Sequence, residues 1–477
     1  MYYKLCDDVL FREYKDVGYI TDNLEFGYHM LNSSRRYHKE KYVSKSGAIM
    51  LSELSRTPKS IDSIVQSLLS IFKGVDYDTL RTDTEVFYQM FIKEGFILSG
   101  YDIESCSKAS PVITAGKVSS EVVSIESSEN CTKNLFDPKD FLKSIHIEIA
   151  SECNERCVHC YIPHESKNKV ISQGLFNRIL EEGKRLNIIN VILSGGEPLL
   201  NKDIIPFLCK CKELDLSVNI LTNLTLLTDE VLDAMKDTPL LSVQTSLYSM
   251  DPTIHDQITM RNGSFEKTRS GILKLISSGI PVQISCPIMK QNRDSFASVI
   301  KWGFEHNIGV VTEPVIFAAY DHSRRNLVNR LDIGELSDVI DKLIPNGYAE
   351  MMRQQAIEKE AQKSDYPICS ICRYNFCVSA EGKVFPCVGW QTNVIADLNR
   401  QDVKDIWENS PDIKRFRTIK RNSFPKCVNC KDRGYCTVCM MSNSNENSDG
   451  DAFRINDYHC KVAALIHDKV DKYYRNK

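Results

Sequence analysis

Three features that would direct a protein to a membrane, a nucleic acid or a secretory route are missing from this sequence. No stretch of the 477 residues approaches the roughly 18 uninterrupted apolar residues of a membrane-spanning helix. The first residues, MYYKLCDD, lack the basic region and the apolar run of a signal peptide. With 60 Lys and Arg against 63 Asp and Glu, the net charge of -3 gives no field that would hold nucleic acid or an anionic membrane. We therefore expect a cytoplasmic protein that binds neither.

Cysteine, by contrast, is unusually abundant. The chain has 18 cysteines, and because cytoplasmic proteins rarely keep structural disulfides, clustered thiols there are better interpreted as metal ligands or catalytic groups. Most of them gather in three groups, at residues 153–160, 369–387 and 427–460. We expect the scattered remainder to be small buried residues without a chemical role. These are Cys6, Cys106, Cys131, Cys209, Cys211 and Cys286.

Residues 1–102 are predicted to form a winged helix-turn-helix domain. Short alternating runs indicate strands, and apolar residues at helical spacing indicate three helices. The predicted strands and helices lie around LFREY, GYITD, SGAIMLSELS, residues 61–72, residues 80–91 and GFILS.

The strongest of these helices, SIDSIVQSLLSIFKG, argues against DNA as the ligand. It has few basic or amide side chains that could read a major groove, and the charge around it is mixed. Residues 103–138, which follow the domain, are rich in serine and have little periodicity, which predicts a linker.

Residues 139–345 are predicted to form a partial (β/α)6 barrel. Strand-like and helix-like stretches alternate, which is typical of a parallel sheet with helices on its faces, and the chemistry of such a barrel gathers on loops at the carboxyl ends of the strands. Because strands of this kind are expected to be buried on both faces, alternation in the sequence does not mark an inward face, and we assign no general base. The predicted strands are HIEIAS, NVILSGGEP, SVNILTN, LLSVQTSL, PVQISCPIM and GVVTEPVIF.

The loop after the first of these strands carries Cys153, Cys157 and Cys160 in the spacing C-x3-C-x2-C. A [4Fe-4S] cube has four irons that each take a terminal ligand, so three thiolates would leave one iron open to a small molecule. A zinc ion would need a fourth ligand, which His159 or His164 could supply. The loop alone therefore admits both metals.

The sequence SGGEP, after the second strand, favours the cube. Gly195 and Gly196 would let the backbone approach a ligand closely, and Glu197 would offer a carboxylate to an ammonium group. A small molecule with an amino group at an open iron would use both features.

Together, the C-x3-C-x2-C loop, the tyrosine that follows it and SGGEP resemble the radical S-adenosylmethionine (radical SAM) enzymes. The resemblance implies that the amino and carboxylate groups of S-adenosylmethionine chelate the open iron. It further implies that an electron from the cluster cleaves the sulfonium to a 5′-deoxyadenosyl radical, which abstracts hydrogen from a substrate. By position, the residues implied to contact S-adenosylmethionine are Tyr161, Gly195, Gly196, Glu197, Pro198, Asn223 and Ser246.

Residues 346–477 resemble the SPASM extension found in part of that family. Gly382-x4-Cys387 is followed by CVNCKDRGYCTVC, whose last gap is one residue shorter than in the usual SPASM pattern. The resemblance implies two auxiliary [4Fe-4S] clusters, and hence three clusters in all. It assigns Cys369, Cys372, Cys387 and Cys439 to the first auxiliary set and Cys427, Cys430, Cys436 and Cys460 to the second.

One ligand of the first auxiliary set stays open. Cys372 has the family's spacing to Gly382, Cys377 is the alternative, and a substrate thiolate could also fill the position.

Ahead of a radical SAM and SPASM unit, the N-terminal region resembles the peptide-recognition domain of enzymes that modify ribosomally made peptides. Such domains are related to the small chaperone of pyrroloquinoline quinone biosynthesis, and they capture the leader of a precursor peptide as an added strand at a sheet edge. We therefore predict a peptide maturase that joins a cysteine sulfur to a carbon in a thioether and takes electrons from an external donor.

Other functions are alternatives. Carbon–carbon crosslinking needs the same parts, and radical epimerisation would need a hydrogen donor, for which Cys286 is the one barrel-strand thiol outside the three groups. A sulfatase-maturing enzyme, which oxidises a residue of a folded partner, would not need the N-terminal domain. A non-catalytic iron–sulfur regulator that binds DNA would not need SGGEP.

Overall fold

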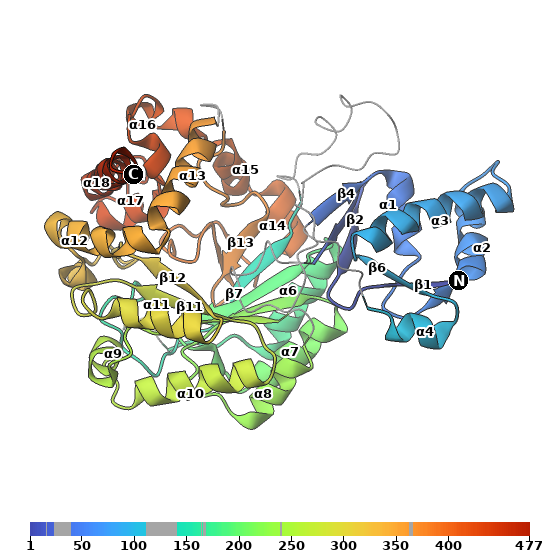
Figure 1. The fold of residues 1–477 in the computed structure, drawn as a ribbon, viewed down its shortest axis with the longest axis horizontal. Coiled ribbons are helices and arrows are strands. Elements are labelled where there is room, and N and C mark those ends of the chain that lie inside the picture. Colours follow the sequence, from blue (N-terminus) through green and yellow to red (C-terminus); the bar gives the residue numbers. More distant parts are fainter. Residues whose placement is uncertain are drawn as a thin grey trace.

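The computed structural model describes residues 1–15, 17–22, 40–110, 141–163, 165, 168–238, 241–361 and 366–477. Cys131, His164 and residues 111–138 of the predicted linker lie outside these residues. Figure 1 shows a small N-terminal unit beside a sheet flanked by helices, with the C-terminal helices at the far side. In the described residues, no helix is both long and apolar enough to cross a membrane.

The described part of the N-terminal unit combines short strands with four helices. Its elements are β1 (Tyr2–Leu5), β2 (Leu10–Tyr14), β3 (Val17–Thr21), β4 (Glu40–Val43), α1 (Lys45–Ser52), β5 (Lys59–Ser60), α2 (Ile61–Ile71), α3 (Tyr77–Lys93), β6 (Ile97–Gly100) and α4 (Ile103–Lys108). The strands form two antiparallel sheets, with the orders β5-β1-β6 and β2-β3-β4. Helix α4 packs against β1 and β6, so the six residues after the predicted boundary at residue 102 belong to this unit.

Local signals explain where its two long helices begin. The side chains of Ser60 and Asp76 accept hydrogen bonds from the backbone amides of Ser63 (3.2 Å) and Thr79 (3.0 Å), which satisfies one free amide of α2 and one of α3. Ile61, Ile64, Val65 and Leu68 of α2 recur at helical spacing and are all buried in one core.

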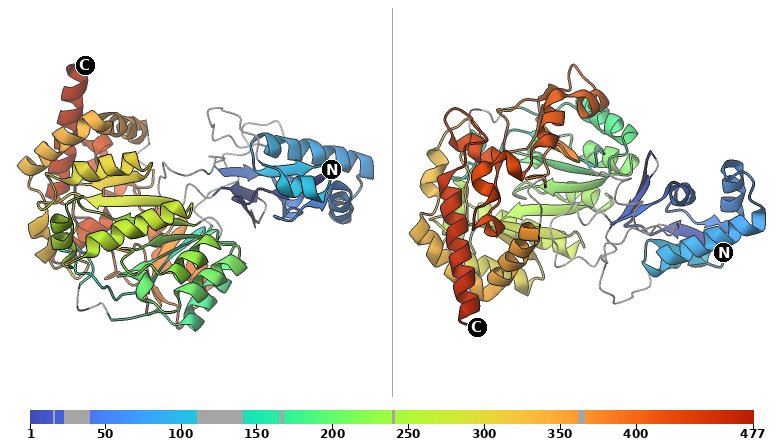
Figure 2. Two further views of the ribbon diagram at one scale, coloured as in Figure 1. Left: turned by 60° about the horizontal axis from the view of Figure 1, so that its bottom comes forward. Right: turned by 90° about the horizontal axis from the view of Figure 1, so that it is seen from above.

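A partial barrel with six parallel strands follows, as predicted. Its elements are β7 (Ser144–Ala150), α6 (Gln173–Arg185), β8 (Asn190–Gly195), the 3-10 helix η3 (Pro198–Leu200), α7 (Ile204–Glu213), β9 (Ser217–Leu221), α8 (Asp229–Lys236), β10 (Ser242–Ser246), α9 (Pro252–Thr259), α10 (Ser264–Ser277), β11 (Val282–Pro287), α11 (Phe296–Glu305) and β12 (Gly309–Glu313). Neighbouring strands pair in chain order from β7 to β12. Figure 2 shows the helices of this region on the outer face of the curved sheet.

The two faces of this sheet differ in chemistry. On β7, Ile145, Ile147 and Ile149 are fully buried among the apolar residues that pack under the helices. The alternate residues, His146 and Glu148, therefore face the inside of the barrel, because successive side chains of a strand point to opposite faces. We call this inner side of the barrel the lumen. In the other strands, too, every second side chain faces the lumen, and several of these side chains are polar. They are Ser194, Asn219, Gln244, Ser246 and Ser285.

The N-terminal unit contacts the opposite end of the barrel from the carboxyl-end loops. Arg12 of β2 donates to the backbone carbonyl of Ile188 (3.2 Å) and forms an ion pair with Asp215 (3.1 Å), and these two residues lie just before β8 and β9. Tyr14 donates to the carbonyl of Asn187 at 2.8 Å. In the described residues, this contact therefore lies away from the mouth of the barrel.

The C-terminal region extends the barrel sheet as well as adding helices. Its elements are the 3-10 helix η4 (Arg325–Asn329), α12 (Ile333–Leu343), η5 (Ile344–Asn346), α13 (Tyr348–Ala361), β13 (Asn375–Val378), β14 (Lys383–Phe385), β15 (Ala396–Asp397), α14 (Val403–Asn409), α15 (Pro411–Thr418), η6 (Arg421–Ser423), α16 (Pro425–Val428), η7 (Arg433–Tyr435), α17 (Met440–Glu446) and α18 (Asp457–Arg475). Strand β13 pairs in parallel with β7, with Cys377 opposite His146, and the antiparallel strands β14 and β15 follow. One sheet thus spans the barrel and the start of the SPASM-like region.

Candidate active site and cluster ligands

The three cysteines of the first loop follow β7 at the carboxyl end of the barrel. Cys153, Cys157 and Cys160 are half-buried. Burial raises the pKa of Cys157 well above its usual value, and the nearby Glu155 and the other two cysteines raise it further. The three side chains are therefore near neighbours, and a metal that binds them must displace their protons.

The arrangement suits a cube better than a single ion. No three described His, Cys, Asp or Glu side chains converge on a point where one metal ion could bind. A [4Fe-4S] cube does not require such convergence, because each thiolate binds a different iron. His164, the second histidine of the zinc alternative, lies outside the described residues.

A tyrosine that the sequence did not single out lies against this loop. Tyr248, two residues beyond the end of β10, is buried, and its hydroxyl donates to Sγ of Cys157 at 3.9 Å and lies 3.5 Å from Nε2 of His159. The side chain of Ser246 also hydrogen-bonds this phenol, and burial raises the pKa of Tyr248 well above 10, so the phenol stays a donor. Its one sequence signal is an aromatic residue just after the fourth barrel strand.

The two glycines of SGGEP bring the second loop against the first. Gly195 has a φ of 136°, and a Cβ placed there would lie 1.8 Å from the carbonyl oxygen of Ala150. A Cβ at Gly196 would lie 2.1 Å from the carbonyl oxygen of Glu152. The backbone amide of Gly196 donates to the same Ala150 carbonyl at 2.8 Å. The space next to these glycines is thus filled by the backbone of the cysteine loop.

Glu197 is fully buried, and both of its carboxylate oxygens accept hydrogen bonds from the protein. Oε1 accepts from the backbone amide of Leu199 (2.9 Å) and from the hydroxyl of Thr222 (2.6 Å), and Oε2 accepts from the amide of Asn223 (2.7 Å). Burial raises its pKa to about 7. The carboxylate thereby joins η3, whose first residue is Pro198, to the end of β9. Its contact with an ammonium group stays a prediction.

Asn223 joins the third strand to the cysteine loop. Its side-chain amide donates to Oδ1 of Asn154 at 2.8 Å, and Asn154 in turn donates to the hydroxyl of Thr225 at 2.6 Å. The structure therefore gathers the seven predicted S-adenosylmethionine contacts on the loops and strand ends around Cys153, Cys157 and Cys160, while leaving their ligand contacts as predictions.

Five cysteines of the SPASM-like region form a first group. Cys372 and Cys377 are buried, Cys387 and Cys439 are half-buried, and Cys369 is exposed. Burial raises the pKa of Cys372 to about 12, with Cys369 and Cys387 among the neighbours that raise it further. Cys377 likewise has Cys387 and Cys372 among its charged neighbours. The donor set fits a cube, and the choice between Cys372 and Cys377 stays open.

The remaining four cysteines form a second group. Burial raises the pKa of Cys436 to about 11, and Cys460, Cys427 and Cys430 raise it further, in that order. Cys460 lies in the first turn of α18, whereas the other three lie on the loops and short helices before α17. In sequence, Cys439 of the first group falls between members of the second, so the two groups interleave along the chain, and their assignment to two cubes stays a prediction.

Residues 314–330, which we call the strap, lead from β12 past the cysteine loop. The backbone amide of Tyr320 donates to the carbonyl of Tyr161 at 3.1 Å. The side-chain amide of Asn326 donates to the carbonyls of His159 (3.1 Å) and Phe317 (2.7 Å). The strap thereby fixes the backbone on either side of Cys160.

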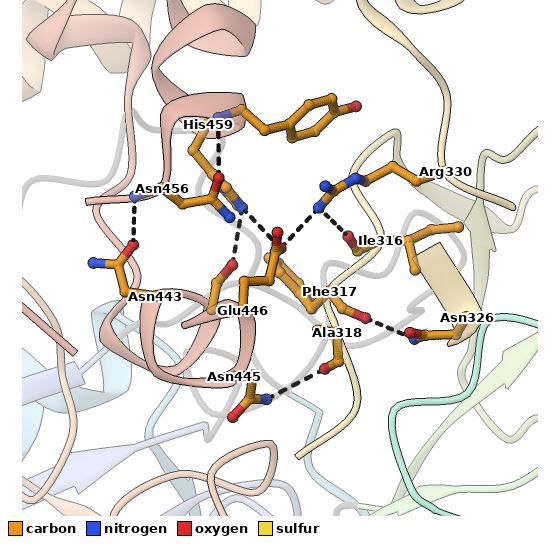
Figure 3. Close-up of polar contacts among 12 residues, drawn as sticks. Ile316, Phe317, Ala318, Asn326, Arg330, Asn443, Asn445, Glu446, Asn456 and His459 are labelled. Carbon is orange, nitrogen blue, oxygen red and sulfur yellow. Dashed lines mark hydrogen bonds and ion pairs between the residues drawn. The ribbon is translucent and has the colours of Figure 1, made fainter. Parts of the chain in front are cut away.

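The same strap also reaches the helix that follows Cys439, as Figure 3 shows. Asn445 of α17 donates to the carbonyl of Ala318 at 3.3 Å. Arg330 donates to Glu446 of α17 at 2.7 Å, and His459 lies 3.9 Å from the same carboxylate. A continuous set of contacts therefore runs from the cysteine loop to both SPASM-like cysteine groups.

A three-thiol loop at the mouth of a partial barrel, with two further thiol groups, is the arrangement of an iron–sulfur enzyme. Comparison with known families gives the more specific identity. Residues 147–303 match the radical SAM superfamily, and residues 350–431 match SPASM, an iron–sulfur cluster-binding domain. The protein is a radical SAM enzyme with a SPASM domain, which confirms two of the resemblances noted in the sequence, and the resemblance of the N-terminal region to a peptide-recognition domain stays a prediction.

Relatives and solved structures extend this assignment. The chain is 26% identical over 319 residues to an AdoMet-dependent heme synthase of Methanosarcina barkeri, covering 61% of this chain and 89% of that protein. It is 25% identical over 357 residues to a PqqA peptide cyclase of a Methylobacterium species, and the match covers 67% of this chain and 87% of that protein. SuiB of Streptococcus suis, solved with its precursor peptide SuiA, has the same fold over 96% of this chain and 99% of its own, with 13% identity and a TM-score of 0.59.

Proposed function

We propose that this radical SAM enzyme is a peptide maturase, and that it joins a cysteine sulfur to a carbon atom within a ribosomally made precursor peptide. The observation that carries the proposal is the presence, in one chain, of an N-terminal unit, a radical SAM barrel and two auxiliary thiol groups. The likeness to SuiB covers all three parts. Because SuiB was solved with a precursor peptide, that likeness supports a peptide as the substrate here.

The proposed division of labour follows the parts of the fold. Residues 1–102, with the added helix α4, would recognise the leader, residues 139–345 would carry the radical site, and residues 346–477 the auxiliary clusters. In the sheet β2-β3-β4 of the described residues, β4 is at an edge, and an edge strand can pair with an added peptide strand.

At the radical site, the chain's own residues would hold the group and orient it. Cys153, Cys157 and Cys160 would bind three irons of the cube, and Tyr248 would donate a hydrogen bond to the Cys157 sulfur. S-adenosylmethionine on the reduced cube supplies a 5′-deoxyadenosyl radical, which abstracts a hydrogen atom from the substrate. Asn223 and Glu197 would keep the surrounding loops in place through the hydrogen bonds described above.

The auxiliary groups favour an oxidative reaction. Forming a thioether from a thiol and a C–H bond removes two electrons, one of which leaves with the hydrogen atom. Oxidised [4Fe-4S] cubes held by Cys387 and Cys439, and by the second group, would provide an acceptor for the other. An external donor would supply the electron that starts each cycle.

Crosslinking through carbon is the second candidate. The match to PqqA peptide cyclases supports a peptide reaction without specifying the bond. Epimerisation has less support, because Cys286 is fully buried on the helix-facing side of β11 and donates to the carbonyl of Tyr248. A sulfatase-maturing reaction on a folded partner would leave the N-terminal unit without a role.

The test is an anaerobic incubation with S-adenosylmethionine, a reductant and a short cysteine-containing peptide encoded beside the gene, read by tandem mass spectrometry. We expect the loss of two hydrogens and of one alkylatable thiol, with suppressed fragmentation between two residues. The same loss with every thiol free would replace the proposal by carbon–carbon crosslinking. Deuterium gained from solvent without a net loss of hydrogen would replace it by epimerisation.

Removal of residues 1–119 tests the leader-binding role separately. We expect the truncated enzyme to cleave S-adenosylmethionine but to process the full precursor more slowly than the whole chain does. Equal processing of the precursor by both forms would refute this role.

A further inference from the structure

The lumen contains a carboxylate that none of the roles above uses. Glu148 lies on the inward face of β7, two residues beyond His146, which hydrogen-bonds Ser194 of β8. Only 4% of Glu148 is exposed. Its Oε2 accepts a hydrogen bond from Nε2 of Gln391 at 2.7 Å.

The other oxygen of this carboxylate has no such bond. In the described part of the chain, Oε1 of Glu148 is buried and accepts no hydrogen bond. Leaving a buried polar atom unsatisfied costs about 1–3 kcal/mol, and more for a charged group, so it calls for an explanation in the function of the site. A donor from a bound molecule would satisfy it.

The surroundings of Glu148 place it between the two kinds of cluster site. Burial raises the pKa of Tyr161, the residue after Cys160, and that of Cys377 on the neighbouring strand β13, and the nearby charge of Glu148 raises both further. Gln391, which holds it, follows Cys387 by four residues. The neighbours of Glu148 among the described residues therefore come both from the cysteine loop and from the SPASM domain.

The other buried or inward carboxylates fit this position less well. Both oxygens of Glu197 are already bonded to the protein. Glu155 belongs to the cysteine loop and contacts Cys157. Glu313, at the end of β12, has a side chain that solvent reaches, although the protein around its carboxylate raises its pKa by burial, and it accepts a hydrogen bond from the backbone of Val315. Glu148 alone of the four is buried, outside the cysteine loop and incompletely bonded.

We propose that Glu148 is a catalytic residue that contacts the reacting cysteine of the peptide and takes its thiol proton as the sulfur–carbon bond forms. This role rests on the proposed thioether function. It gives the maturase the general base that its sequence did not reveal.

The step balances. The hydrogen atom of the C–H bond leaves in 5′-deoxyadenosine, and the proton of the S–H bond passes to the carboxylate of Glu148. The new S–C bond forms, and an oxidised [4Fe-4S] cluster held by cysteines of the SPASM domain would accept the one remaining electron. The peptide thus loses two protons and two electrons in total.

The experiment compares Glu148→Gln with the wild-type holoenzyme and with Glu313→Gln, which changes the other inward carboxylate. Crosslinked peptide and 5′-deoxyadenosine are measured in the same anaerobic reaction, and iron content and peptide affinity are measured on each protein. We expect Glu148→Gln to keep its iron, its peptide affinity and its 5′-deoxyadenosine formation. Its crosslink per 5′-deoxyadenosine should fall by about 100-fold or more, the usual contribution of a general base. Glu313→Gln should keep the wild-type ratio.

Two results would overturn the role of Glu148. One is an unchanged ratio of crosslink to 5′-deoxyadenosine in Glu148→Gln. The other is loss of 5′-deoxyadenosine itself at full iron content, which would assign Glu148 to the S-adenosylmethionine site. If Glu148→Gln binds less than its full iron, Glu148→Asp takes its place. In Glu148→Asp the carboxylate is drawn back by one methylene. A misplacement of about 1 Å can cost about 100-fold, so we expect the ratio of crosslink to 5′-deoxyadenosine to fall by up to that factor. A wild-type ratio in this variant would overturn the role.

The two proposals fail in different ways. A wild-type enzyme that makes no thioether refutes the proposed function, and with it the thiol as the source of the proton. A wild-type enzyme that makes the thioether, beside a Glu148→Gln variant that does so at the same ratio, refutes only the role of Glu148.

Discussion

Arg330 and Glu446 lie 116 positions apart in the sequence and form a nearly buried ion pair, with Nη1 2.7 Å from Oε1. Their side chains are only 10% and 5% exposed. Arg330 ends the strap and Glu446 ends α17, so the pair fastens the barrel to the helix that follows Cys439. The guanidinium also lies 4.0 Å from the centre of the Tyr458 ring, which adds a second contact with the SPASM domain.

Breaking this pair should destabilise the enzyme strongly. Removing one partner of a buried ion pair leaves an uncompensated charge, which costs about 3–5 kcal/mol. We expect Glu446→Ala to lower the free energy of unfolding by that amount in anaerobic urea denaturation. The double variant Arg330→Met with Glu446→Leu removes both charges and should lose much less. Equal losses in the two proteins would contradict this account.

Gly195 should tolerate no side chain. Gly195→Ala would place a Cβ against the carbonyl of Ala150 in a backbone conformation that L-residues rarely adopt, so the SGGEP loop and the cysteine loop must separate. We expect a loss of about 3 kcal/mol or more in unfolding free energy, since strain and overpacking add. Gly174→Ala is the control, because a Cβ there meets nothing within 4 Å. A Gly195→Ala enzyme as stable as this control would disprove the close approach.

The three thiol groups should bind iron independently. Reconstituted wild-type protein is expected to hold about 12 iron atoms, three cubes of four, and replacing Cys153, Cys157 and Cys160 by alanine should leave about 8. The triple variant should form no 5′-deoxyadenosine, as measured by chromatography. Cys209→Ala, at an exposed thiol outside the groups, should change neither value. Continued 5′-deoxyadenosine formation by the triple variant would show that another site cleaves S-adenosylmethionine.

The hydrogen bond from Tyr248 should tune the radical cluster. Hydrogen bonds to ligand sulfurs favour the reduced state of a cube, so Tyr248→Phe should lower its reduction potential and slow its reduction. Spectroscopic redox titration of the enzyme measures the shift. Tyr101→Phe, on the exposed surface of the N-terminal unit, should leave the potential unchanged. A higher potential in Tyr248→Phe would reverse the assigned sign.

Stability should fall as the pH rises through the range in which Glu148 titrates. Burial raises the pKa of Glu148 from its usual 4.5 to about 7, so between these values the folded state keeps a proton that the unfolded state has lost. The stabilisation is complete below about pH 4.5 and lost by about pH 7, with a slope of about 1.4 kcal/mol per pH unit. Urea denaturation at about pH 5, 6 and 7 should show a flatter dependence for Glu148→Gln than for the wild type. Parallel curves would contradict the raised pKa.

Most of the architecture could be predicted because its signals are local. The apolar spacing of Ile61, Ile64 and Val65 indicated a helix, and the βα alternation indicated the barrel. The predicted domain boundary at 102 stopped at the residue that caps the next helix, since Asp102 accepts from the amide of Ser105. Whether a capped helix packs against the domain before it or belongs to the segment after it depends on tertiary contacts, which leave no local pattern in the sequence.

The inward face of the barrel was readable in principle. We expected the strands to be buried on both faces and assigned no inward face, yet β7 alternates isoleucines with His146 and Glu148, and the polar set faces the lumen. A partial barrel that must admit a substrate does not fill its lumen with apolar side chains, so its strands keep a period of two. By contrast, the contacts of Tyr248 with Cys157, and of Arg330 with Glu446, join residues about a hundred positions apart and leave no local pattern.

The pairing of β13 with β7 has a consequence for engineering this enzyme. An enzyme chimaera that exchanges the SPASM domain at residue 345 would give a foreign neighbour to the strand that carries Glu148 and leads into the cysteine loop. Where the foreign strand does not match, the edge of β7 would offer unpaired amides and carbonyls to other chains. A chimaera would have to take β13 and β7 from the same parent enzyme. Two segments more than 200 residues apart in the sequence therefore have to be exchanged together.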